Sequence, residues 1–209
     1  MRNNVCVWAL ATLMVAAGVS QGASYLDGGI GYARLSLDGN NGDEISGWGP
    51  AFRYWFSDVM DGNGLRPFLG LHSTNYLGDS DEDSIWNVWM LAPEVGLAWH
   101  KSLGDSGLFI EPSMTAGAAI AMYTRRGDYL VSYYVGEDDM AVGWVVRPGV
   151  LLGYQRDSWS IGAEVSYGLL NVDFSDKVRF VFDGELYTSP EVKGTHEELY
   201  IGLFGRFYW

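Results

Sequence analysis

The sequence is poor in cysteine, proline and positive charge, and each shortage excludes a class of protein. One cysteine among 209 residues leaves no disulfide framework. Six prolines against 28 glycines exclude a collagen-like or proline-rich disordered chain. Lys and Arg total 13 against 26 Asp and Glu, for a net charge of −13. We therefore expect no nucleic-acid partner, because phosphate binding requires clustered Lys and Arg.

Long hydrophobic runs are also scarce, and the one present lies at the N-terminus. The apolar run Val5–Val19 follows Arg2 and precedes a small and polar stretch that ends at Ala23. This order is typical of a secretory signal peptide, and the run is shorter than the about 20 residues of a membrane-spanning helix. We predict a cleaved signal peptide over residues 1–23 and one mature domain over residues 24–209; an uncleaved anchor is the alternative.

Cleavage would also change the chemistry of the mature chain. It removes Cys6, so the exported protein would contain no cysteine and must be held by burial and hydrogen bonds alone. It also removes Arg2, which takes the net charge to −14. We predict no bound cofactor or metal.

Helical periodicity is hard to find after the signal, and alternation with a period of two recurs along most of the chain. In the segment 87–101, the odd positions from Trp89 to Trp99 are apolar and mostly bulky, whereas the even positions mix small residues with charge. The pattern predicts eight strands: Tyr25–Leu37, Gly47–Ser57, Pro67–Leu77, Asn87–Lys101, Leu108–Arg125, Ala141–Tyr154, Trp159–Val172 and Glu198–Trp209.

The less apolar face of these strands is rich in Gly, Ala and Ser with about one charge per strand. Such a face suits a narrow barrel interior better than a water-exposed surface, so the apolar face would point to lipid. Only helices and closed barrels satisfy every backbone group in a bilayer. We therefore predict an all-β fold, an eight-stranded antiparallel up-and-down transmembrane β-barrel. The rival is a soluble lipocalin-like barrel, with its polar face outward.

Aromatic residues on the outward face are spaced as in a membrane girdle. Trp89 and Trp99 lie ten residues apart, as do Trp144 and Tyr154. Ten tilted strand residues rise about 25 Å, the height of the apolar band of such barrels. The predicted girdle is Trp48, Trp89, Trp99, Trp144, Tyr154, Trp159 and Trp209.

The connections alternate between short and long, as in outer-membrane barrels. The longer ones, predicted to lie outside, are rich in acidic residues: Asp38–Ser46, Gly78–Ile85, Arg126–Met140 and Asp173–Glu197. The last should contain a hairpin of Val178–Phe182 and Glu185–Thr188 around Asp183-Gly184.

Six charged residues fall on the inward face and are the candidate site: Arg53, Glu94, Glu111, Arg147, Glu164 and Arg206. Buried charges must be paired, so we expect each arginine beside at least one of these glutamates. The network would be either a static polar core or the gate of a small pore.

Other chemistry has weaker support. His72, His100 and His196 lie on different strands, and alternation points His72 and Ser73 to opposite faces, against a nucleophile–base pair. A lipid-modifying enzyme is therefore the least favoured alternative.

The acidic run Asp79–Asp83 begins like a calcium loop but lacks its later glycine and glutamate. Arg126-Gly127-Asp128 matches an adhesion tripeptide that also occurs by chance.

The C-terminal alternation from Leu199 ends on a terminal aromatic, Trp209, and resembles the terminal signal of bacterial outer-membrane barrels. Together with the signal peptide, the chain resembles the small eight-stranded barrels of the OmpA-transmembrane-domain and OmpX kind. That resemblance implies residence in the bacterial outer membrane, contact with outer-membrane lipid, and recognition of the last strand by the assembly machinery. We also expect a monomer. The resemblance implies no single activity. Our first expectation is a structural or surface-interaction role through the acidic outer loops.

Overall fold

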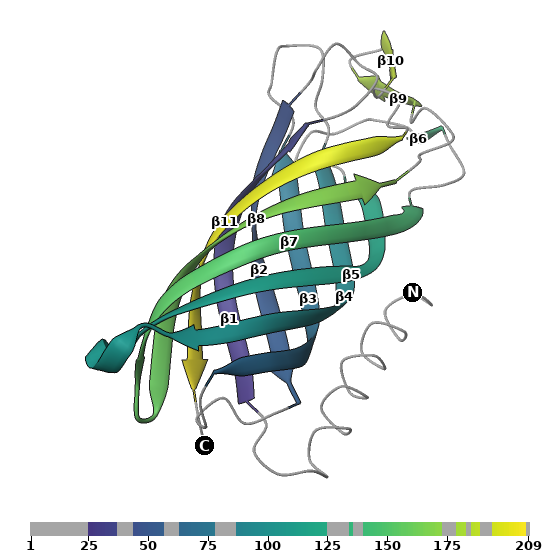
Figure 1. Cartoon of the computed structure of the whole chain (residues 1–209). Helices are drawn as coiled ribbons and strands as arrows, with labels where there is room; N and C mark the ends of the chain where they lie inside the picture. Colours follow the sequence, from purple (N-terminus) through teal and green to yellow (C-terminus); the bar gives the residue numbers. More distant parts are fainter. Residues whose placement is uncertain are drawn as a thin grey trace.

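Eight antiparallel strands close into a barrel (Figure 1). The structure is a computed structural model, and it describes residues 25–36, 44–56, 63–77, 87–124, 134–135, 140–172, 179–182, 185–188 and 194–207. The barrel strands are β1 (Tyr25–Ser36), β2 (Glu44–Trp55), β3 (Gly64–Leu77), β4 (Asn87–Ser102), β5 (Leu108–Thr124), β7 (Met140–Arg156), β8 (Trp159–Asn171) and β11 (Thr195–Phe207). Each pairs with its neighbours in the chain order of these eight, and β1 pairs with β11 to close the ring. The predicted fold class is confirmed.

A second, three-stranded sheet lies beyond one end of the barrel, in the order β10-β9-β6 (Figure 1). We call this end the upper end. Strands β9 (Arg179–Phe182) and β10 (Glu185–Thr188) form the hairpin predicted from the sequence, although its turn at Asp183-Gly184 lies outside the described residues. Strand β6 (Tyr134–Val135) pairs with β9. Two residues are too few to show an alternating pattern in the sequence.

The opposite, lower end is formed by tight connections. Strands β7 and β8 are joined through Asp157 and Ser158, with Arg156 paired to Trp159. Strands β4 and β5 are joined through the 3-10 turn η1 (Gly104–Ser106). Gly107 has φ +80° and leads the chain into β5, a conformation that side chains with a Cβ rarely adopt. No helix in the described part of the chain is long and apolar enough to cross a membrane.

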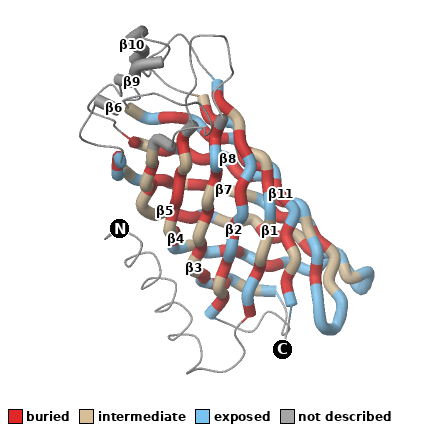
Figure 2. Tube along the Cα trace, turned by 180° about the vertical axis from the view of Figure 1, so that it is seen from behind, coloured by how far each residue is buried: buried red, intermediate tan, exposed pale blue. Residues whose placement is uncertain are grey.

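Burial alternates along most of the length of the barrel strands (Figure 2). Large apolar side chains point outward: Leu97 is 49% exposed and Val150 is 44% exposed. Their neighbours on the inward face, such as Ala98 and Leu151, are buried. The polarity is thus inverted relative to a soluble barrel, because buried polar and charged groups face apolar groups on the outside.

Three predicted strand starts differ by three residues from those observed. β2 starts at Glu44, inside the predicted loop Asp38–Ser46, because the ladder continues to the pair Ser36–Glu44. β11 starts at Thr195, inside the predicted loop Asp173–Glu197, because it pairs with Asn171. β3 starts at Gly64 and not at Pro67, since an outward proline does not prevent pairing with β4.

The closing seam between β1 and β11 is packed by aromatic rings that lie against glycine. The ring of Tyr200 covers Gly31 and Gly202, and a Cβ on either glycine would overlap it. The ring of Phe204 covers Gly29 in the same way. Glycine is required here because the rings approach the backbone of the barrel wall directly.

Candidate functional site: the charged barrel interior

The barrel interior collects charged side chains from all eight strands. Alternation directs one or two of them inward from each strand, and all are at least 92% buried. They are Asp27 (β1), Arg53 (β2), Arg66 (β3), Glu94 (β4), Glu111 (β5), Arg147 (β7), Glu164 (β8), and Glu198 and Arg206 (β11).

The group nearest the upper end is centred on Arg147. Its guanidinium forms an ion pair with Glu94 on β4 and a second one with Glu198 on β11, where Nε donates at 3.2 Å. The hydroxyl of Tyr76 also donates to Glu198. One arginine therefore balances two carboxylates, and a phenol helps to satisfy the second.

A middle group joins Arg53 to Glu164 across the lumen, from β2 to β8. The guanidinium carbon of Arg53 lies 4.7 Å from the ring centroid of Phe204 and 5.2 Å from that of Phe68. Stacking on ring faces suits a planar guanidinium that is removed from water.

The group nearest the lower end is centred on Arg206. It donates to both oxygens of Asp27, at 2.5 and 2.7 Å, and to Glu111 at 3.0 Å. The same Glu111 lies 3.1 Å from Nδ1 of His100. The guanidinium also lies 4.6 Å from the ring centroid of Trp55, so aromatic rings close the lumen beneath the ion pairs.

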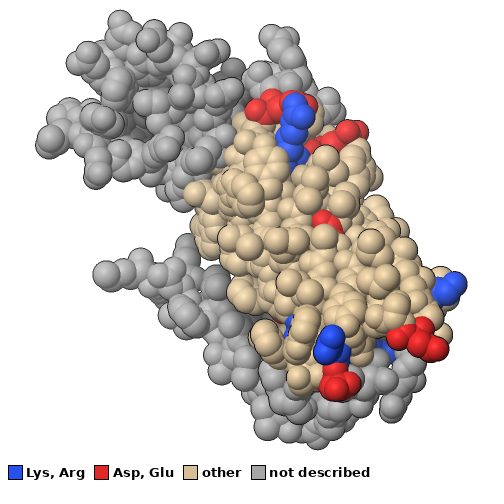
Figure 3. All heavy atoms as spheres, turned by 90° about the vertical axis from the view of Figure 1, so that its left-hand side faces the viewer, with Lys and Arg blue, Asp and Glu red and all other residues tan. Residues whose placement is uncertain are grey.

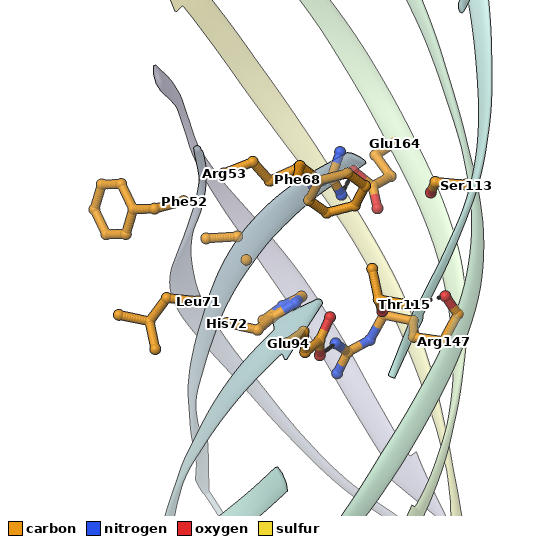
Figure 4. A pocket seen from close by; sticks show the side chains of 12 residues that line it. Phe52, Arg53, Phe68, Leu71, His72, Glu94, Ser113, Thr115, Arg147 and Glu164 are labelled. Carbon is orange, nitrogen blue, oxygen red and sulfur yellow. Dashed lines mark hydrogen bonds and ion pairs between the residues drawn. The ribbon is translucent and has the colours of Figure 1, made fainter. Parts of the chain in front are cut away.

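Between the upper and middle groups lies a small cavity (Figure 4). Its volume of about 10 Å³ is about what one water molecule needs. Arg53, His72, Glu94, Arg147 and Glu164 line it, whereas the side chains of Phe52 and Leu71 point away from it. In this part of the lumen, side chains fill the space, as expected for an eight-stranded barrel.

The structure places all six predicted interior residues inside the barrel, and each of the three arginines contacts one of the predicted glutamates. Sequence reasoning missed four further members of the network: Asp27, Arg66, His100 and Glu198. For Glu198, the available signal was parity, because it lies on the same face of β11 as Arg206, which was already assigned inward.

The predicted girdle residues lie on the outward face where they are described. Trp48, Trp99, Trp144 and Trp159 are exposed, whereas Trp89 and Tyr154 are partly covered; Trp209 lies outside the described residues. Trp48 is opposite Tyr32 on β1, toward the upper end of the barrel. Trp159 is opposite Phe207 on β11, at the lower end, so aromatic residues are paired toward both ends.

The other sequence candidates do not assemble into a catalytic set. His72 is buried in the lumen, while Ser73 faces outward and accepts a hydrogen bond from Nε1 of Trp89 at 2.8 Å. His196 contacts the carbonyl oxygen of Val172 at 3.2 Å. The acidic run Asp79–Asp83 and the tripeptide Arg126-Gly127-Asp128 lie outside the described residues. Among the described residues, no group of three His, Cys, Asp or Glu could hold a metal ion.

Comparisons with known proteins agree with the barrel at the level of fold. No protein-family model and no curated protein matches the chain. The solved structure of Neisserial surface protein A (NspA) is 13% identical with a TM-score of 0.52, over 90% of this chain and 100% of NspA. Ail, the attachment invasion locus protein of Yersinia pestis, is 13% identical with a TM-score of 0.48, over 90% and 99%. The outer membrane enzyme PagL is 18% identical with a TM-score of 0.31, over 85% and 98%.

The likeness to NspA shows the fold and not the activity. The chain has the architecture of the small eight-stranded barrels found among outer-membrane proteins. The predicted resemblance to this class is therefore confirmed.

Proposed function

We propose that this protein is an integral protein of the bacterial outer membrane, with a structural or surface-interaction role and no catalytic activity. The observation that carries the proposal is the inverted polarity of the barrel. Apolar side chains such as Leu97, Val142 and Leu203 are about half or more exposed, while the charged network is buried. Figure 3 shows the same distribution on one face, where charged residues gather toward the two ends and the wall between them is largely uncharged.

The location and orientation follow from the same reasoning. The signal peptide predicted over residues 1–23 would export the chain, and the C-terminal strand would present it to the assembly machinery. The upper end, where β6, β9 and β10 join two connections into one sheet, would face outward. The short lower turns would face the periplasm. Interaction with a partner would then involve the upper end, and the barrel itself would act as a monomeric anchor in outer-membrane lipid.

The pore and enzyme alternatives receive less support. Three ion-paired groups occupy successive levels of the lumen, and a cavity between two of them has room for about one water molecule. His72 and Ser73 lie on opposite sides of the barrel wall. Conductance in planar bilayers tests the pore: discrete single-channel openings by the purified protein would favour it over the structural role.

The proposal is tested by placing a charge on the apolar wall. Val95→Arg is expected to destabilise the protein by about 2–4 kcal/mol in a lipid-vesicle unfolding assay, because Val95 is 61% exposed and lies about midway between Trp89 and Trp99, near the bilayer midplane. Ser102→Arg, at the exposed lower end of the same strand, is the matched control and should cost about 0–1 kcal/mol. If the two variants unfolded alike, the wall would not face hydrocarbon and the membrane proposal would fail.

A further inference from the structure

His72 is a buried ionisable group that the ion-pair network does not use. It points inward from β3 and is 8% exposed. Its Nε2 atom is buried and has no hydrogen-bond partner among the described residues. The ring packs edge-on against Tyr200, with centroids 4.3 Å apart, and lines the small cavity beside Glu94 and Arg147 (Figure 4).

Charged groups face His72 from several strands. Arg53 on β2 and Arg147 on β7 line the same cavity, as do the carboxylates of Glu94 on β4 and Glu164 on β8. Tyr200 on β11 is the remaining titratable neighbour. Both arginines are already ion-paired, and no ion pair joins His72 to a carboxylate within the described residues. A neutral imidazole suits this setting, because protonation would place a third positive charge beside those of Arg53 and Arg147.

The upper group contains one carboxylate that can move without leaving a buried charge alone. Arg147 is paired with both Glu94 and Glu198, so it keeps a partner if Glu94 leaves. In the β3–β4 register, Glu94 is opposite Gly70 and His72 is opposite Ala92. Glu94 and His72 are therefore diagonal neighbours on one face of the sheet. Such neighbours have backbones about 7–8 Å apart, a distance that their side chains can span.

We propose that His72 is a proton-operated switch for the Arg147–Glu94 pair. At neutral pH the imidazole is neutral and Arg147 holds both carboxylates. In acid the imidazole takes up a proton from water in the cavity, draws the Glu94 carboxylate to itself, and leaves Arg147 with Glu198. The interior of the closed barrel then has two charge arrangements selected by pH, an ability that goes beyond a static polar core and does not depend on the proposed location.

The first test follows the arginine side chains of the wild-type protein. Nitrogen NMR of the guanidinium groups in lipid nanodiscs, from pH 7.5 to 4.5, should show the Arg147 signals shifting while the Arg206 signals stay in place. The His72→Gln variant should abolish the shift, and His100→Gln, which removes an imidazole already beside Glu111, should keep it. An Arg147 signal that stays fixed throughout, or that moves together with Arg206, would overturn the proposal.

The second test measures the folding equilibrium constant as a function of pH, and it does not require resolved NMR signals. A histidine in an unfolded chain has a pKa near 6.5. While His72 stays neutral in the fold, the wild-type folding equilibrium constant should fall with decreasing pH relative to that of His72→Gln, by up to about 30-fold at pH 5.0. This extra loss should level off at the pH at which the Arg147 signals shift, because the folded protein then takes up the same proton. An extra loss that continues without levelling off down to pH 4.5 would mean that His72 stays neutral in the fold, and it would overturn the switch.

Discussion

The closing seam of the barrel is held by a buried ion pair whose removal has a calculable cost. Asp27 and Arg206 are directly opposite each other in the register of β1 and β11. Two hydrogen bonds of 2.5 and 2.7 Å join them, and the two residues are 1% and 3% exposed. Asp27→Asn keeps the shape of the side chain and removes its charge, so it tests the pair with little change in packing.

The expected magnitude follows from the partners that remain. Breaking a buried ion pair by removing one charge costs about 3–5 kcal/mol. Arg206 keeps Glu111, at 3.0 Å, and its place over the ring of Trp55. The guanidinium is therefore not left alone, and we expect the lower limit, a loss of about 3 kcal/mol. That loss corresponds to about 150-fold in the folding equilibrium constant.

The assay is urea unfolding of the purified protein in lipid vesicles, followed by tryptophan fluorescence. Glu44→Gln is the control, because Glu44 and Arg34 also pair between β1 and a neighbouring strand, but at an exposed position. Exposed pairs contribute about 0–1 kcal/mol. The reasoning is refuted if Asp27→Asn unfolds within 1 kcal/mol of the wild type, or if both variants lose the same amount.

Two further predictions concern packing and processing. Gly96→Ala is expected to cost about 1–3 kcal/mol because the new methyl group would overlap the ring of Phe68, whereas Gly70→Ala should be well tolerated, since its Cβ would meet no atom closer than 3.7 Å. Vesicle unfolding of the two variants measures the difference, and equal stabilities would contradict the prediction. Mass spectrometry of protein extracted from membranes should give an N-terminus near Ser24, and an intact Met1 in most molecules would contradict the cleaved signal peptide.

The sequence was sufficient to predict the strands and the direction of their side chains, because alternation is a local property. Parity alone placed Arg53, Arg147 and Arg206 inside the barrel. The tight turn at Asp157-Ser158 is equally local, and it fixes which residues of β7 and β8 are opposite one another. Leu151 is opposite Glu164, as that turn requires.

The partners of the interior charges could not be predicted, because they depend on the stagger of the closed barrel. Arg53 and Glu164 are separated by 111 positions and meet only when all eight strands have their final tilt. Asp27 was missed because the glycines that follow it weaken the alternation of β1. Glu198 was missed because it stood at the predicted boundary between a loop and the last strand, where pattern limits are least certain.

The contribution of β11 to the lumen bears on the order of events during folding. This strand supplies Glu198 to Arg147, Tyr200 to His72, Phe204 to Arg53 and Arg206 to Asp27. Because β11 closes the ring between β1 and β8, a seven-stranded sheet without it would leave these interior carboxylates and guanidiniums without their partners on β11. Closing the ring and removing water from the interior are therefore coupled, because the strand that joins the two ends of the barrel also supplies partners to the interior charges.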